Sequence, residues 1–150
     1  WRMELSEGRD IVLINDSYNA NPESMAAALK TLALITQERG GRSWAFLGTM
    51  HELGPDSSAL HKQIGKLVAE LEIDHLVAIG NRDYLTEAHG SSEQFFAKAE
   101  EAEKMIDKFE PGDVLLIKAS RAEHLDLLAD KVKNFLQSPT GSSELKGEWK

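Results

Sequence analysis

The sequence predicts an α/β domain built on a Rossmann-like, mostly parallel sheet of about six strands, with helices on both faces. Short runs of β-branched and other apolar residues alternate with longer segments in which apolar residues recur every three to four positions. Glycine or proline separates most of these segments, as expected where strands and helices end. Alternation of this kind needs crossover connections, which give parallel strands covered on both sides. The opening segment is expected to add one antiparallel strand.

The first half of the chain predicts a hairpin followed by helices and one strand. The hairpin turn is expected at residues 7–9, which contain a glycine. Asn21 is a favourable N-cap for the helix that follows, and Pro22 suits its first position. Glycines 40 and 41 are expected to end that helix. The expected elements are strands at 2–5 and 10–15, a helix at 22–39, a strand at 43–47 and a helix at 57–72.

The second half continues the alternation and ends in a tail. Residues 111–113, Pro-Gly-Asp, predict a turn before the last strand, and Ser120 is placed to cap the last helix. The expected elements are a strand at 75–79, short elements at 83–88 (helix) and 93–96 (strand), a helix at 97–109, a strand at 114–117 and a helix at 120–136. From residue 138 onward Ser, Pro, Gly and Lys dominate. We therefore expect one domain at 1–137 and a flexible tail at 138–150.

Composition limits the classes of function. The net charge of −8 argues against general nucleic-acid binding, which needs a basic face. The absence of cysteine excludes disulfides and thiolate metal sites. No apolar run approaches the ~20 residues that span a bilayer, and no charged-then-apolar leader opens the chain. The expectation is a cytoplasmic protein with neither a membrane nor a nucleic-acid partner.

Polar residues follow the first long predicted strand, at the edge of the sheet where ligands bind in such folds. Asp16 can accept hydrogen bonds from ribose hydroxyls, Tyr18 can stack on a base, and Asn19 offers both a donor and an acceptor. The same residue types also build Asx turns and helix caps. We expect ligand binding for Asp16, Tyr18 and Asn19, and capping for Asn21.

Cations follow two of the later strands. Asn81 and Arg82 come after one strand, while Lys118, Ser120 and Arg121 come after the last, where a helix is expected to begin. Backbone N–H groups and fixed positive charge together favour an anion, and a guanidinium can grip a carboxylate through two parallel bonds. The alternative is solvated side chains at a helix start, an unfavourable place for a cation without an anion.

His51, Glu52 and His61 lack a characteristic metal-ligand spacing, so no metal site is expected. The sequence contains neither of the glycine-rich phosphate-binding patterns, G-x-x-x-x-G-K-[ST] and G-x-G-x-x-G after a strand, and it suggests no nucleophile with its base. It therefore predicts a domain that positions ligands and has no catalytic residue of its own.

These motifs resemble the third domain of the Mur ligase family. The resemblance rests on four runs and runs from about residue 2 to residue 132: Arg-Met-Glu-Leu at 2–5, Asp-Ser-Tyr-Asn-Ala-Asn-Pro-Glu-Ser-Met at 16–25, Leu-Gly-Thr-Met-His-Glu-Leu-Gly at 47–54, and Lys-Ala-Ser-Arg at 118–121. Thr49 stands where the family usually has an acid, and Ala119 where it usually has glycine. The Tyr-Asn-Ala-Asn-Pro run resembles the members that add D-alanyl-D-alanine.

The resemblance implies part of an ATP-dependent, amide-bond-forming ligase that adds D-alanyl-D-alanine to UDP-N-acetylmuramoyl-tripeptide during peptidoglycan precursor synthesis. It implies a sugar-nucleotide domain, a central P-loop domain holding most of the ATP and Mg²⁺, and this domain as a closing lid. It further implies ATP contacts by Arg2, Asp16, Tyr18 and Asn19. It implies dipeptide contacts by Lys118, Ser120 and Arg121, and more weakly by Asn81 and Arg82. We expect the isolated chain to lack ligase activity.

Three alternatives stay open on the sequence alone. The chain could come from a Mur ligase that adds a single amino acid, from a folylpolyglutamate-synthase-like ligase, or from a non-catalytic α/β binding module. The Tyr-Asn-Ala-Asn-Pro run speaks against the first two. The third requires a parent protein without a P-loop domain.

Overall fold

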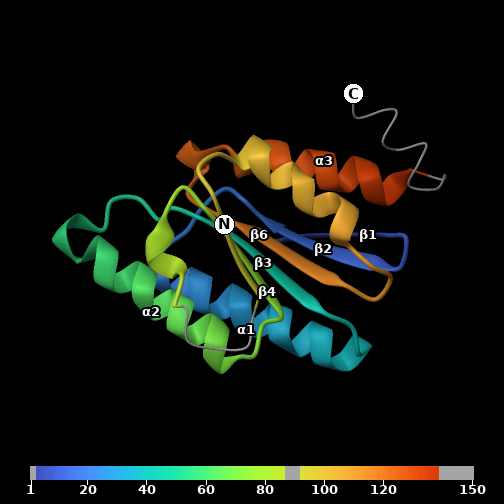
Figure 1. Ribbon diagram of the computed structural model, residues 1–150, viewed down its shortest axis with the longest axis horizontal. Helices are drawn as coiled ribbons and strands as arrows, with labels where there is room; N and C mark the ends of the chain where they lie inside the picture. The colour runs from blue at the N-terminus through green and yellow to red at the C-terminus, as the bar shows by residue number, and fades with distance from the viewer. Residues whose placement is uncertain (1–2, 87–91, 139–150) are drawn as a thin grey trace.

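The computed structural model describes residues 3–86 and 92–138 and arranges them as a sheet between two helical layers (Figure 1). The sheet has six strands in the order β1-β2-β6-β3-β4-β5. Their bounds are β1 Glu4–Gly8, β2 Ile11–Asp16, β3 Ser43–Gly48, β4 His75–Ile79, β5 Ser92–Phe96 and β6 Val114–Lys118. The β1–β2 pair is antiparallel and the other four pairs are parallel. The predicted fold class is confirmed.

Helices cover both faces of this sheet. The α-helices are α1 Pro22–Arg39, α2 Ser57–Glu70 and α3 Leu125–Gln137. The 3₁₀ segments are η1 Gly54–Asp56, η2 Arg82–Tyr84, η3 Ala99–Lys108 and η4 Arg121–Glu123. Helices α1 and α2 lie on one face, and α3 and η3 lie on the other (Figure 1). In the part of the chain that the structure describes, no helix has the length and apolar character needed to cross a bilayer.

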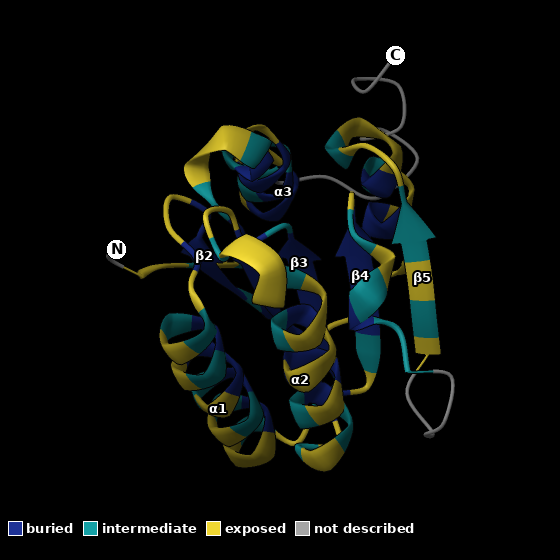
Figure 2. Ribbon diagram, turned by 90° about the vertical axis from the view of Figure 1, so that its left-hand side faces the viewer, coloured by how far each residue is buried: buried dark blue, intermediate teal, exposed yellow. Residues whose placement is uncertain are grey.

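The central strands are buried on both faces, so they read as continuous apolar runs. Along β6, Leu115 and Ile117 belong to the core under α3, whereas Val114 and Leu116 belong to the core over α1 and α2. This division follows from the two-residue period of a strand. Figure 2 shows the result: buried strands in the middle, and helices whose outward surfaces are exposed. The central strands therefore hold the carboxyl ends of the sheet in fixed register.

The cap predicted for α1 is confirmed. Asn21 Oδ1 accepts a hydrogen bond from the Ser24 backbone N–H at 2.9 Å, and Ser24 Oγ accepts one from the Asn21 N–H at 3.1 Å. This reciprocal capping box satisfies two N–H groups at the start of the helix. Gly40, with φ of 77°, ends the helix as expected.

The hairpin turn lies one step later than predicted. Arg9 and Asp10 form it, both with positive φ (54° and 61°), and Gly8 belongs to β1. A Cβ at Gly8 would lie 2.0 Å from the Leu136 carbonyl oxygen. The glycine is thus needed for close packing of β1 against the end of α3. Local turn chemistry gave no sign of this long-range contact.

The predicted start of the last helix is wrong. Residues after β6 first form η4, and His124 then adopts a left-handed conformation (φ 59°) before α3 begins at Leu125. Ser120 does not cap α3. Its hydroxyl instead accepts a hydrogen bond from the His51 backbone N–H at 2.9 Å. A contact between two loops, remote in sequence, therefore replaces the local cap.

Two other elements differ in kind or length from the prediction. The helix expected at 97–109 is a 3₁₀ helix, η3. The short helix expected at 83–88 is reduced to η2, after which Leu85 and Thr86 are not helical. The rest of that range lies outside the described residues. The short strand expected at 93–96 is confirmed as β5.

Candidate functional site

The carboxyl ends of β2, β6, β3 and β4 meet along one edge of the sheet. Asp16 at the end of β2 pairs with Lys118 at the end of β6, and Leu47 of β3 pairs with Lys118 on its other side. Gly48 in turn pairs with Ile79 at the end of β4. We call the residues at and just beyond these ends, 16–21, 48–54, 80–82 and 118–124, the carboxyl rim. The expected convergence of the polar segments is therefore present.

The centre of the carboxyl rim is a buried ion pair. Lys118 is only 1% exposed, and its Nζ donates hydrogen bonds to Asp16 Oδ2 at 2.7 Å and to the Asn19 carbonyl at 2.7 Å. The family resemblance implies nucleotide contacts for Asp16 and Asn19 and a dipeptide contact for Lys118. The structure brings all three into contact with one another inside the domain.

Three consecutive residues at the end of β2 carry buried acceptors without a partner among the described protein atoms. These atoms are Asn15 Oδ1, Asp16 Oδ1 and Ser17 Oγ. Their residues are 2%, 5% and 1% exposed, respectively. An unmatched buried polar group is costly, typically by about 1–3 kcal/mol. Three at one strand end indicate a place where a ligand or solvent completes the hydrogen bonding.

Asn15 and Ser17 were not among the predicted binding residues. The sequence did carry a signal for them, because both belong to the polar run that interrupts an apolar strand before a helix. Their burial was not readable from that run. An exposed turn and a buried ligand cradle use the same residue types.

Several predicted binding residues are exposed beside this buried centre. Tyr18 is 42% exposed, and Asn19 and Arg121 are also exposed. In the described residues, the Arg121 guanidinium has no hydrogen bond or ion pair. Its charge is therefore available to an anion. Arg2 lies outside the described residues.

The loops after β3 and β6 are fastened together. The Ser120 N–H donates to the Thr49 carbonyl at 3.2 Å, and the His51 N–H donates to Ser120 Oγ. On the same loops, His51 Nε2 lies 2.5 Å from Glu123 Oε2. Ser120 is thus partly committed to joining two loops of the carboxyl rim. These contacts set the position of the neighbouring Arg121.

His61 supports the loop after β3 from below. Its Nε2 accepts a hydrogen bond from the Met50 N–H at 2.9 Å, so its proton lies on Nδ1, which faces the Ser57 carbonyl at 2.7 Å. Tyr84 donates to the Gly48 carbonyl and packs edge-on against the His61 ring. Burial raises the pKa of Tyr84, which keeps its hydroxyl a donor. These two fully buried side chains hold the backbone of the loop after β3 in place.

No group of three His, Asp or Glu side chains in residues 3–86 and 92–138 lies close enough together to hold a metal ion. The three residues that the sequence offers as possible metal ligands have different surroundings. His61 is buried under the loop, His51 meets Glu123, and Glu52 is exposed in a left-handed conformation with φ of 63°.

Asn81 and Arg82 lie on the same edge but farther along it. They follow β4, which is separated from β6 by β3. Asn81 Oδ1 accepts a hydrogen bond from the Asp83 N–H at 2.8 Å, and the Arg82 guanidinium lies 4.0 Å from the centre of the Phe95 ring. Asn81 is thus partly used in capping η2. Arg82 is exposed and rests on the sheet's edge strand.

A cavity of about 530 Å³ adjoins the other side of the carboxyl rim. It lies among the end of β4, the start of η3 and the start of α3, and its lining includes Lys98, Glu123, His124 and Lys131. Acidic and basic groups are both present, and Lys131 already pairs with Glu103 at 3.4 Å. Arg121 is not part of this lining, but it lies on the segment between β6 and α3 that leads into the cavity.

Fold and rim together define a doubly wound α/β domain whose candidate binding residues gather at the carboxyl ends of parallel strands. The family model described as "Mur ligase, glutamate ligase domain" matches residues 1–121. The chain belongs to the Mur ligase family.

Individual relatives agree with this assignment. The chain is 38% identical over 153 residues to the UDP-N-acetylmuramoyl-tripeptide--D-alanyl-D-alanine ligase of Mycobacterium tuberculosis (strain CDC 1551 / Oshkosh), covering 86% of the chain and 30% of the relative. The Bacillus subtilis (strain 168) protein of the same name is 30% identical over 135 residues, covering 85% and 28%. The chain therefore spans less than a third of the length of these relatives.

Solved structures share the fold. A crystal structure of MurF from Acinetobacter baumannii matches with a TM-score of 0.75 and 29% identity, over 87% of this chain and 30% of that one. MurF ligase from Thermotoga maritima, in complex with ADP, matches with a TM-score of 0.73 over 89% of this chain and 30% of that one. At 23% identity, the second match supports the fold alone.

Proposed function

We propose that this chain is the closing domain of an ATP-dependent ligase that adds D-alanyl-D-alanine to UDP-N-acetylmuramoyl-tripeptide in peptidoglycan precursor synthesis. The observation that carries the proposal is the carboxyl rim, which holds both buried acceptors and the exposed Arg121, none of them with a hydrogen-bonding partner among the described residues. Family membership and the shared name of the relatives support the same reaction.

The nucleotide side of the proposed site is the end of β2. Asp16 Oδ1 and Ser17 Oγ are suited to hydrogen bonds with ribose hydroxyls, since neither buried acceptor has a partner in the part of the chain that the structure describes. The exposed ring of Tyr18 can lie against a base or a sugar, and the Asn19 amide can bond to either. The proposed approach of Arg2 to ATP rests on the family resemblance alone.

The dipeptide side of the proposed site is the segment after β6. Arg121 can hold the carboxylate of D-alanyl-D-alanine through two parallel hydrogen bonds. The loop contacts of Ser120 fix where Arg121 begins, which limits the orientations that the dipeptide can take. Asn81 and Arg82 are kept as weaker candidates, because they lie farther along the same edge.

The chemical contribution of this domain is positioning. In the proposed reaction, another domain transfers the γ-phosphoryl group of ATP to the tripeptide carboxylate and releases ADP. The dipeptide amine then attacks the acyl phosphate, forming the amide bond and expelling inorganic phosphate. Holding the two reactants together and excluding water can lower such a barrier by up to ~7–11 kcal/mol, and a closing domain is a common means. We name no general base in this chain, and we assign Mg²⁺ to the P-loop domain. We place the enzyme in the cytoplasm, where ATP is available.

The test is an acceptor panel on the full-length protein. Purified protein is given ATP, Mg²⁺ and UDP-N-acetylmuramoyl-tripeptide, and phosphate release is measured with D-alanyl-D-alanine, with single amino acids, or with no acceptor. We expect turnover with the dipeptide and none from the 150-residue chain alone. Preference for a single amino acid would indicate another ligase of this kind. A full-length protein without a P-loop domain would indicate a binding module.

A further inference from the structure

Lys118 is a fully buried cation whose two hydrogen-bond acceptors both belong to the proposed nucleotide-binding segment. Its Nζ lies 2.7 Å from Asp16 Oδ2 and 2.7 Å from the Asn19 carbonyl oxygen, and the side chain is 1% exposed. Both hydrogen bonds of its ammonium group are therefore made inside the domain. Its charge acts on neighbours within the domain.

We infer that Lys118 is a positioning residue for the nucleotide: it orients the Asp16 carboxylate and anchors the segment 17–21 that carries Tyr18. This inference rests on the proposed function and gives Lys118 a role toward the nucleotide, in place of the dipeptide contact that the family resemblance implies. Lys118 acts on ATP only through Asp16 and the backbone of Asn19.

The Asp16 carboxylate is held from one side. Lys118 binds Oδ2, while Oδ1 is buried without a partner among the described residues. A carboxylate fixed through one oxygen cannot rotate freely, so the other oxygen keeps a constant direction. A preset acceptor avoids the entropic cost of ordering it when the ligand binds.

The bond to the Asn19 carbonyl fixes the adjoining segment. This segment runs from the end of β2 to the capping box at Asn21, and Lys118 reaches its middle from a different strand. Exposed Tyr18 lies directly before the anchored residue. Loss of Lys118 would therefore free the segment that bears the exposed ring, while both ends stay attached to β2 and α1.

Stability alone is a weak explanation for such a pair. Removing two charges from water is costly, and replacing a whole buried ion pair by apolar groups is often neutral or stabilising. Removing only one partner leaves the other charge buried and unpaired, which is destabilising. A buried lysine that fixes two acceptors of one segment fits a role in orientation.

The test compares Lys118→Met, Asp16→Asn and the double variant in the full-length protein, with Lys30→Met as the control at an exposed position on α1. We expect Lys118→Met to weaken binding of a non-hydrolysable ATP analogue on the order of tenfold, the usual worth of a hydrogen bond to a charged group. The KM for D-alanyl-D-alanine should stay near the wild-type value. The double variant should bind the analogue no more weakly than the poorer single variant, because both changes break the same Lys118–Asp16 ion pair.

A second readout needs no ligase activity. Amide hydrogen exchange of residues 17–21, without ligand, should quicken in Lys118→Met and stay unchanged in Lys30→Met. Quickened exchange in a protein without D-alanyl-D-alanine ligase activity would refute the proposed function but not the anchoring. A raised dipeptide KM with unchanged nucleotide affinity, or additive losses in the double variant, would overturn the inference. So would wild-type exchange in a folded Lys118→Met.

If Lys118→Met does not fold, the double variant is used for the same two measurements, since it leaves no buried, unpaired charge. Weak nucleotide binding with rapid exchange at 17–21 then supports the positioning role. Nucleotide affinity and exchange equal to wild type would overturn it.

Discussion

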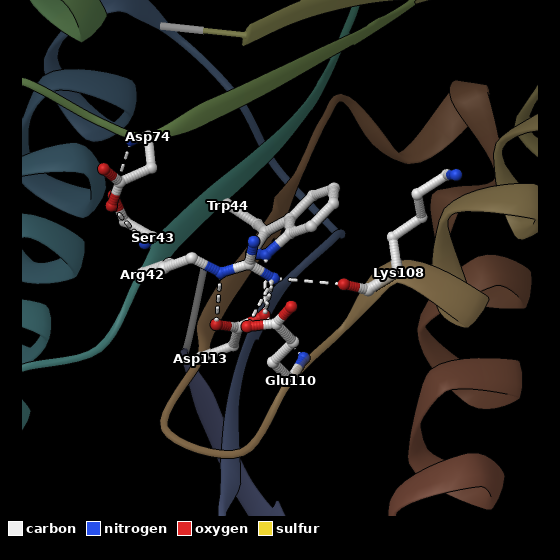
Figure 3. A network of polar contacts seen from close by, with 7 residues as sticks. All are labelled: Arg42, Ser43, Trp44, Asp74, Lys108, Glu110 and Asp113. Carbon is white, nitrogen blue, oxygen red and sulfur yellow. Dashed lines mark hydrogen bonds and ion pairs between the residues drawn. The ribbon is translucent and has the colours of Figure 1, made fainter. Parts of the chain in front are cut away.

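The buried carboxylates at the two ends of the parallel strands are paired differently. The amino ends of these strands form the amino edge of the sheet, and their carboxyl ends form the carboxyl edge, where the carboxyl rim lies. At the amino edge, Asp113 is 1% exposed and accepts hydrogen bonds from Arg42 Nε (3.1 Å), Trp44 Nε1 (2.9 Å) and the Glu110 N–H (2.9 Å) (Figure 3). At the carboxyl edge, Asp16 has one oxygen paired with Lys118 and the other unmatched. Both carboxylates are buried, but only the first is saturated within the domain.

This difference indicates that the amino edge contributes to stability and the carboxyl rim to ligand binding. A saturated buried carboxylate fixes the connections between strands and has nothing left to offer a ligand. The hydrogen bond to Asp113, together with its charge, also raises the pKa of Arg42, which favours the ion pair in the folded state. Changes at the amino edge should therefore affect unfolding, and changes at the carboxyl rim should affect ligands.

The largest effect is expected from Asp113→Ala. It would leave the Trp44 and Glu110 N–H groups without an acceptor and remove the main partner of Arg42. We expect the free energy of unfolding to fall by about 3 kcal/mol, a value reduced because Arg42 is partly exposed and water can replace some of its contacts. Urea denaturation measures this. The KM values for ATP and dipeptide should stay near wild type.

Glu110→Ala is the matched control, because it removes an exposed carboxylate 3.8 Å from the same Arg42. Its expected effect is below about 1 kcal/mol. An equal loss in both variants would show that the amino-edge network is no stronger than a surface ion pair.

Arg121→Ala tests the opposite edge. If this guanidinium binds the dipeptide carboxylate, its loss should cost about 1.5–3 kcal/mol of binding. Steady-state kinetics of the full-length enzyme should show a KM for D-alanyl-D-alanine raised far more than that for ATP. Urea denaturation should show little change, because Arg121 has no partner among the described residues. A wild-type dipeptide KM would remove Arg121 from the site.

Gly48→Ala tests the contact between the two central loops. A Cβ there would lie 2.6 Å from the Ala119 Cβ, so we expect a loss of about 2 kcal/mol in unfolding free energy. The double change Gly48→Ala with Ala119→Gly removes the closest clash and should recover part of that loss. Equal stability of the single and double variants would contradict this account of how Ala119 fits.

The smallest effect is a dependence of stability on pH. Burial, and then the charge of Arg42, lower the pKa of His75 below its ordinary value of 6.5. The folded state thus favours neutral His75, and its contribution is present above the ordinary pKa and lost as pH falls toward the lowered one. His75→Phe keeps a ring beside Trp44 but cannot titrate. Urea denaturation across this range should show a flatter pH profile for His75→Phe, whereas an unchanged slope would assign the dependence to other groups.

The sheet and the convergence of the polar segments were predictable because they follow from general rules. Strand–helix alternation fixes parallel pairing, and parallel pairing places all carboxyl ends at one edge. The α1 cap was also predictable, since Asn21 and Pro22 act locally. Sequence was sufficient where the cause lay within a few residues or within the topology itself.

The features that sequence missed depend on contacts between distant segments. Gly8 looks like a turn residue, but it is required by the backbone of Leu136. Lys118 looks like an exposed cation before a helix, but it is buried against Asp16, which lies 102 positions away in the chain. Ser120 looks like a cap and instead joins the loop after β3. None of these partners can be recognised from the residues next to Gly8, Lys118 or Ser120 in the sequence.

Hydrogen exchange of the full-length protein can show which end of the strands the ligands protect. Exchange is compared without ligands and with an ATP analogue plus D-alanyl-D-alanine. We expect slower exchange in residues 15–21 and 118–124, with no change in residues 108–114 at the amino edge. Protection confined to 108–114, with the carboxyl rim unchanged, would contradict this expectation.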